Sequence, residues 1–170
     1  MIQKKYFNNR SVLVTLIAIL LISLVVRVLG VYTEDIWPDE GLTLHNANKP
    51  LIENIKWSLS LAYFPLYHMV LSWWVKIFGL GELSARSLSI VFGVLSVYMA
   101  YRIGNLMFNK KVGIYSAIIL GVSPFNVFYS QEVRVYSLFV FLSLCSIYYY
   151  IEYIGKKRIY ICSITSYSHY

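Results

Sequence analysis

One long apolar segment, Val12–Tyr32, limits what this chain can fold into. Arg27 is the only charged residue in it, and a helix of roughly twenty residues crosses about 30 Å of hydrocarbon. The segment therefore predicts a membrane-spanning helix, in which we expect the Arg27 side chain to extend outward to the polar surface. A chain with 58% hydrophobic and only 14% charged residues is typical of a polytopic membrane protein. We predict an all-α, polytopic membrane helical bundle.

Further apolar stretches predict the remaining spans of a single transmembrane domain over residues 1–170. The predicted spans are about 12–32, 88–108, 112–129 and 133–154, with a partial fifth at 159–170. The basic prefix before the first span resembles the start of a signal peptide, but no cleavage site follows the apolar stretch. We therefore predict an uncleaved first helix.

Charged residues in the short breaks between spans predict how the chain is oriented. Lys110 and Lys111 form one break, Gln131 and Glu132 the next, and the third is the basic stretch 155–158. Under the positive-inside rule, the N-terminus and the two basic breaks face the cytoplasm. We therefore predict a multi-pass cell-membrane protein with segment 33–86 outside. The net charge of +7 is then explained by cytoplasmic anchoring, and no nucleic-acid partner is needed.

The predicted outer loop, 33–86, is too long for a simple turn. Its pattern predicts two amphipathic helices at the membrane surface, about 49–62 and 65–79, the second opened by Pro65 and closed by Gly79. The alternative is that the second helix is a tilted or re-entrant span. In that case the orientation of every later segment is inverted, which the charge distribution disfavours.

Acidic residues at the predicted outer face are the candidates for chemistry. Asp39 and Glu40 follow Trp37-Pro38, which is suited to hold the two carboxylates near the bilayer surface. Glu132 opens the fourth predicted span. The other outer acids are interpreted as solvated loop residues, namely Glu34, Asp35, Glu53 and Glu82. Cys145 and Cys162 indicate neither a disulfide nor a metal site.

Five short motifs occur in an order and at spacings that resemble the N-terminal part of family 39 glycosyltransferases. These enzymes have the GT-C fold and are related to protein O-mannosyltransferases and to the aminoarabinose transferase of lipid A. The resemblance covers about residues 27–153. The motifs are Ile36-Trp37-Pro38-Asp39-Glu40, Phe64-Pro65-Leu66-Tyr67, Ile77-Phe78-Gly79, Ala85-Arg86-Ser87-Leu88-Ser89, and Ser123-Pro124-Phe125 continuing to Tyr129–Tyr136.

The resemblance implies transfer of a hexose or pentose from a polyprenyl-phosphate donor to an acceptor hydroxyl, with inversion at the anomeric carbon. Asp39 takes the role of general base, with Glu40 beside it as the second catalytic residue. Arg134, and after it Arg86, is placed to contact the donor phosphate. For both arginines a membrane-end anchor or a structural ion pair, with Glu82 or Glu132, stays open.

Four further residues are predicted to contact substrate, with packing or interfacial roles as their alternatives: Glu132, Gln131, Tyr67 and Tyr136. His68 stands where many relatives have a tyrosine, and a ligand role is weighed against an interfacial residue without function. No cofactor is implied with certainty, and a divalent metal is left open.

Two other functions stay open beside the enzyme. We expect a typical family member to have more helices than this chain, so the fragment alone is expected to be inactive. A non-catalytic membrane protein, either a relic or a subunit of a split enzyme, is the main alternative. A transporter is the least favoured, because its carboxylates belong near the bilayer midplane. Whether the acceptor is a protein, a lipid or a glycan is not indicated.

Overall fold

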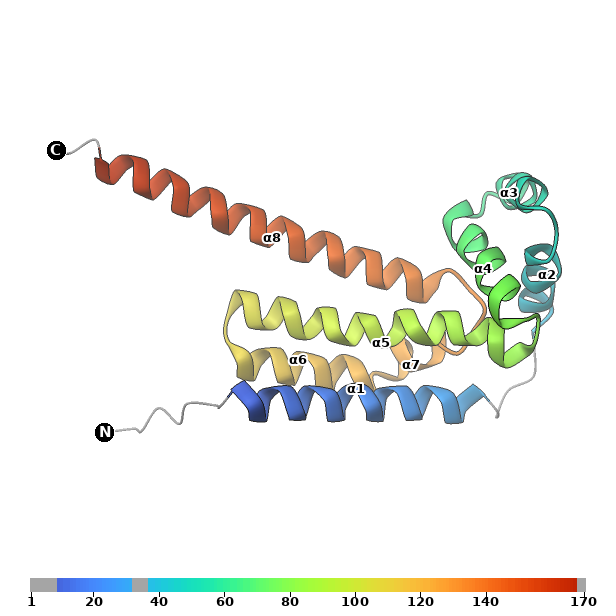
Figure 1. The fold of residues 1–170 in the computed structure, drawn as a ribbon, viewed down its shortest axis with the longest axis horizontal. Coiled ribbons are helices and arrows are strands. Elements are labelled where there is room, and N and C mark those ends of the chain that lie inside the picture. Colours follow the sequence, from blue (N-terminus) through green and yellow to red (C-terminus); the bar gives the residue numbers. More distant parts are fainter. Residues whose placement is uncertain (1–8, 32–36, 168–170) are drawn as a thin grey trace.

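The computed structural model describes residues 9–31 and 37–167, and these residues form helices joined by short turns (Figure 1). The predicted all-α membrane helical bundle is confirmed. In chain order the helices are α1 (Asn9–Val31), α2 (Pro38–Ala47), α3 (Leu51–Ser60), α4 (Pro65–Phe78), α5 (Glu82–Met107), α6 (Lys110–Val122), α7 (Pro124–Tyr129) and α8 (Tyr136–Tyr167).

The bundle consists of α1, α5 and α6 side by side, with α8 crossing α5 at an angle (Figure 1). Helices α2, α3 and α4 form a separate layer at one end of the bundle. Within the part of the chain that the structure describes, three helices are long and apolar enough to cross a membrane: α1, α5 and the part of α8 from Tyr136 to Gly155. The layer α2–α4 therefore lies where α1 ends and α5 begins.

Helices α5 and α6 approach closely at Gly104 and Gly113. A Cβ atom on Gly104 would lie 2.9 Å from the Cα atom of Gly113, and one on Gly113 would lie 2.7 Å from the Tyr101 carbonyl oxygen. Small residues permit such close backbone contact between helices in lipid. This contact holds the first turn of α6 against the last turns of α5.

The apolar stretch that predicts a span at 112–129 forms two helices. Helix α6 has 13 residues, about 20 Å of helix, and ends at Val122. Ser123 is extended, and Pro124 begins the short α7. The break occurs because a proline inside a helix clashes with the preceding turn and lacks an amide donor.

Arg27 does not extend to the surface, so that expectation is wrong. Its side chain is fully buried between α1, α6 and α7. Its guanidinium donates to the Ser23 carbonyl oxygen at 2.9 Å and to the Gly121 carbonyl oxygen at 3.2 Å, and also to the side chains of Ser23 and Asn126. Oxygen atoms at the end of α6 and in α7 replace water as its partners.

The ranges predicted for surface helices, 49–62 and 65–79, coincide with α3 and α4. Gly79 ends α4 with φ at 89°, a conformation that favours glycine. Helix α8 continues through residues 155–158, which the sequence indicates as a break between spans. Where each segment meets the membrane stays a prediction.

Several predicted features lie outside the described residues. These are the basic residues Lys4 and Lys5, the end of the first span at Tyr32, the loop acids Glu34 and Asp35, and the end of the fifth span at residues 168–170.

Candidate functional site

Asp39 and Glu40 are the second and third residues of α2, and they face different surroundings. Successive helix residues are rotated by about 100°, so two adjacent side chains cannot share one face. The Asp39 side chain is 68% exposed, whereas that of Glu40 is 2% exposed. The acid pair therefore divides into one open and one buried carboxylate.

The Glu40 carboxylate is held by three groups. Arg86 Nη2 lies 2.9 Å from Oε2, and Arg86 Nε lies 3.4 Å from Oε1. The Val133 amide donates to Oε1 at 2.6 Å, and the Trp37 amide donates to Oε2 at 3.2 Å, which caps the start of α2. Glu40 thus connects α2 with α5 and with the segment before α8.

Arg86, in the second turn of α5, also binds two groups besides Glu40. Its Nη1 atom donates to the Val31 carbonyl oxygen at 3.0 Å and lies 2.7 Å from Glu82 Oε1. The ion pair with Glu82, which the sequence left open, is therefore present. We call Glu40, Arg86 and the backbone groups of Val31 and Val133 the buried cluster; it joins the end of α1 to α2, α5 and residue 133. Glu82, whose side chain is 41% exposed, pairs with Arg86 at the edge of this cluster.

Asp39 forms an open ion pair with Arg134. Asp39 Oδ2 lies 3.4 Å from Arg134 Nη2, and the Arg134 side chain is 21% exposed. The guanidinium also lies over the ring of Tyr63, 5.6 Å from its centre. Arg134 directly follows Val133, so the buried cluster fixes the backbone that carries it.

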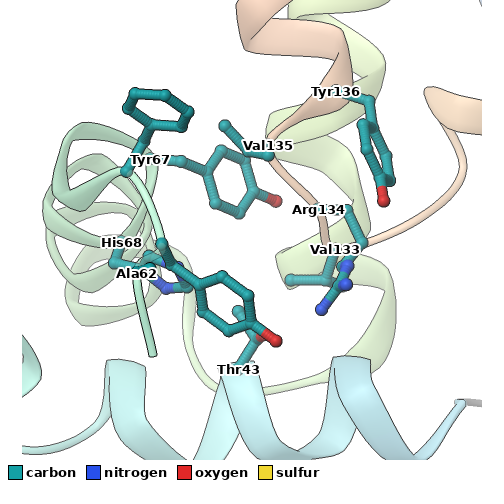
Figure 2. Close-up of a pocket in the computed structure, with 10 residues that line it drawn as sticks. Thr43, Ala62, Tyr67, His68, Val133, Arg134, Val135 and Tyr136 are labelled. Carbon is teal, nitrogen blue, oxygen red and sulfur yellow. The ribbon is translucent and has the colours of Figure 1, made fainter. Parts of the chain in front are cut away.

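A cavity of about 200 Å³ lies beside this open pair (Figure 2). Figure 2 shows His68 on one side of it and Arg134 and Tyr136 on the other. Of the predicted site residues, Tyr67, Arg134 and Tyr136 line it. The other lining residues are Thr43, Ala62, Tyr63, Phe64, His68, Val133 and Val135.

Tyr67 lines the cavity as a buried, neutral phenol. Its hydroxyl lies 3.0 Å from Ser89 Oγ, and burial raises the pKa of Tyr67 above its ordinary value. Tyr67 therefore offers a fixed wall and a protonated hydroxyl, and not a base.

Gln131 and Glu132 belong to the segment that leads into α8, and neither lines this cavity. Gln131 Nε2 donates to the Arg27 carbonyl oxygen at 3.3 Å, at the end of α1. A Cβ atom on Gly30 would collide with this Gln131 amide, so glycine is required for the contact. Glu132 is half-buried. The structure therefore places Gln131 as an anchor of the segment that carries Arg134.

A second, larger cavity lies next to the first, and Tyr136 borders both. Its volume is about 420 Å³, and its walls are mainly apolar. The residues lining it are Leu120, Ser123, Phe125, Asn126, Tyr129, Tyr136, Ser137, Phe139 and Val140. The cavity that contains Arg134 and the second, apolar cavity thus meet at one tyrosine.

Sequence reasoning missed several cavity residues, above all Thr43 and Tyr63. Thr43 follows Asp39 by four residues on α2, so helical spacing was a signal for the first of them. Tyr63 lies in the turn between α3 and α4, and only the packing of that turn under Arg134 reveals it.

The described residues do not fit a metal site. In residues 9–31 and 37–155, no three His, Cys, Asp or Glu side chains lie together as a metal ion would require. Asp39 is paired with Arg134 instead. The question of a divalent metal stays open, as the sequence leaves it.

Helices able to span a membrane, with a cavity and an acid at one end of their bundle, define a membrane protein with a candidate site at that end. A model of the dolichyl-phosphate-mannose-protein mannosyltransferase family matches residues 62–166. The match covers more than half of the chain, and the chain belongs to this family of membrane glycosyltransferases. The match includes Tyr67, Arg86, Arg134 and Tyr136 and begins after Asp39. No curated protein and no solved structure matches the chain.

Proposed function

We propose that this chain binds a polyprenyl-phosphate-linked sugar at the Asp39–Arg134 pair and that the sugar is transferred there to an acceptor hydroxyl. The observation that carries the proposal is the open pair at the cavity, 3.4 Å between Asp39 Oδ2 and Arg134 Nη2, in a chain of the mannosyltransferase family. An exposed carboxylate is available to an acceptor, and an arginine is available to a phosphate.

The reaction requires one base and one cation. Asp39 takes the proton of the acceptor hydroxyl while that oxygen forms a bond to the anomeric carbon. The bond from the anomeric carbon to the phosphate oxygen breaks, and the lipid phosphate leaves with the bonding electrons. Arg134 stabilises the charge that develops on this leaving group. A single displacement of this kind inverts the anomeric configuration.

Glu40 and Arg86 support the reaction without contacting its substrates in this proposal. Both side chains are buried and bound to each other, and neither lines the cavity. Glu40 Oε1 accepts a hydrogen bond from the Val133 amide at 2.6 Å, which holds the backbone one residue before Arg134, and Arg86 holds the Glu40 carboxylate in place. We therefore assign Glu40 and Arg86 as positioning residues, with Asp39 alone as the base.

The adjoining apolar cavity suits the first part of the lipid carrier. Tyr136 borders both cavities, so a phosphate near Arg134 and an apolar chain beyond Tyr136 are compatible with one bound molecule. On the orientation predicted from the basic breaks, the site lies at the outer membrane face and the N-terminus in the cytoplasm.

The proposal is tested with membranes that contain this chain and a polyprenyl-phosphate mannose. We expect transfer to an acceptor by the wild type and its loss in Asp39→Asn, which keeps the size of the side chain and removes the base. Glu53→Gln is the matched control, because Glu53 is an exposed acid on α3, a helix that does not carry the base. Unchanged transfer by Asp39→Asn would remove Asp39 as the base. Donor binding without transfer by the wild type would instead favour a non-catalytic membrane protein.

A further inference from the structure

His68 lies in the second turn of α4, with its ring held on three sides by other aromatic rings. The ring centre is 5.4 Å from that of Trp57 and 5.9 Å from that of Tyr67, both in edge-to-face geometry. Tyr63 lies nearly parallel to it at 5.9 Å. These contacts fix the orientation of the imidazole at the cavity wall.

The Nδ1 atom of His68 is buried and has no hydrogen-bond partner among the described residues. Leaving a buried polar group unpaired costs about 1–3 kcal/mol. The backbone of the same residue is well bound, because Asn54 Nδ2 donates to the His68 carbonyl oxygen at 3.2 Å and to Ser72 Oγ at 2.6 Å. The fold therefore holds His68 firmly while its ring nitrogen is left for another partner.

A neutral polar group would suit this nitrogen as a partner. Burial, and after it the positive charge of Arg134, lowers the pKa of His68 to about 4, so the ring is uncharged near pH 7. A neutral imidazole offers one donor and one acceptor nitrogen, which suits a hydroxyl. Arg134, on the other side of the cavity in Figure 2, suits a phosphate.

Tyr63 contacts both His68 and Arg134. It follows Ala62, whose φ of 56° is costly for a residue with a Cβ atom. The Tyr63 ring faces both the His68 ring and the Arg134 guanidinium. Because Nδ1 is buried, a ligand can reach it only if a neighbouring side chain moves, and we expect Tyr63, which is stacked on the ring, to be that side chain.

We propose that His68 determines donor specificity by hydrogen-bonding, through Nδ1, a hydroxyl of the sugar whose phosphate is bound by Arg134. The inference rests on the proposed function and adds the part of the donor that the cavity recognises. The cavity of about 200 Å³ is smaller than the ~300–1,000 Å³ of common ligand pockets. Its scale suits a single sugar ring.

The test compares binding of two lipids to the chain in lipid nanodiscs: polyprenyl-phosphate mannose and the same polyprenyl phosphate without sugar. His68→Phe keeps an aromatic ring and removes the nitrogen. We expect it to weaken binding of the mannose lipid about 5- to 30-fold, the equivalent of about 1–2 kcal/mol, and to leave binding of the sugar-free lipid within about twofold.

Two further variants separate a hydrogen bond from a change of cavity shape. His68→Asn places an amide near the position of Nδ1, so we expect it to restore part of the affinity for the mannose lipid. Arg134→Gln should weaken binding of both lipids, because both carry the phosphate. Thermal unfolding of each variant checks that the chain remains folded.

The possible outcomes are distinct. If His68→Phe loses affinity for both lipids equally, or for neither, the role of His68 is overturned and the proposed function still stands. If the wild type binds neither lipid, the proposed function fails and the inference fails with it.

Discussion

Two acid–arginine pairs lie side by side at the end of the bundle, and they differ in almost every physical respect. Glu40 and Arg86 are both buried and 2.9 Å apart, with backbone groups of Val31 and Val133 as further partners. Asp39 and Arg134 are 3.4 Å apart, and Asp39 is 68% exposed. Adjacent residues of one helix thus supply a buried pair and an open one.

This difference indicates that the Asp39–Arg134 pair is able to react, whereas the Glu40–Arg86 pair can only stabilise the fold. A buried, fully bonded carboxylate has no free lone pair for a substrate, and removing its partner leaves a charge without water. An exposed pair contributes little to stability and exchanges its partner readily. We therefore expect mutations to separate the two pairs, with stability carried by the first and transfer by the second.

The largest expected effect comes from Glu40→Ala in the buried cluster. It removes the buried acidic partner of Arg86 and the acceptor of the Val133 amide. We expect a loss of about 3–5 kcal/mol in the free energy of unfolding, measured by thermal or denaturant unfolding in detergent. Glu53→Ala, at an exposed site, should change stability by less than about 0.5 kcal/mol. Similar values for the two variants would contradict the distinction.

A fall in pH should lower the free energy of unfolding of the chain, because of His68. Its pKa in the folded chain, about 4, lies below the ordinary 6.5, so the unfolded state binds a proton first as the pH falls. The stabilisation is complete above pH 6.5 and is lost progressively as the pH approaches 4, by at most about 3 kcal/mol. Unfolding curves of the wild type and His68→Phe are measured at pH 7 and pH 4.5. The change in their stability difference between the two pH values gives the contribution of His68. A difference that does not change with pH would refute it.

Arg27 offers a third case, a buried arginine whose described partners are neutral oxygen atoms. Arg27→Leu removes donors from the Gly121 carbonyl oxygen and the Asn126 side chain, and we expect a loss of about 1–3 kcal/mol. The same unfolding measurement applies. A variant as unstable as Glu40→Ala would mean that an acidic partner is not what makes the buried cluster strong.

The smallest expected effect on stability is that of Asp39→Asn. Asp39 is mostly exposed, and its pair with Arg134 is worth no more than about 1 kcal/mol. We expect an unfolding midpoint within about 2 °C of the wild type, together with the loss of transfer proposed above. Marked destabilisation would place Asp39 with the buried cluster instead.

The sequence was sufficient for the class of fold and the family, because both depend on patterns along the chain. Apolar length predicts spanning helices, and motif order predicts the family. Which member of the acid pair is buried was out of reach, since it depends on a hydrogen bond between Glu40 and residue 133, far along the chain. Apolar length also could not reveal the partners of Arg27, which come from Gly121 and Asn126. The contacts of Arg27 depend on where α6 ends, because Gly121 and Asn126 lie on either side of that end.

The amide of Val133, bound to Glu40, has a mechanical consequence. Three residues later begins α8, whose 32 residues extend over about 48 Å. Arg134 lies between this bound amide and the first residue of α8, Tyr136, so both residues are close to the fixed point of the helix. A tilt of α8 imposed by a thinner or thicker bilayer would sweep its far end through the lipid while turning Arg134 almost in place. We therefore expect the thickness of the membrane to affect the orientation of the Arg134 guanidinium toward its ligand.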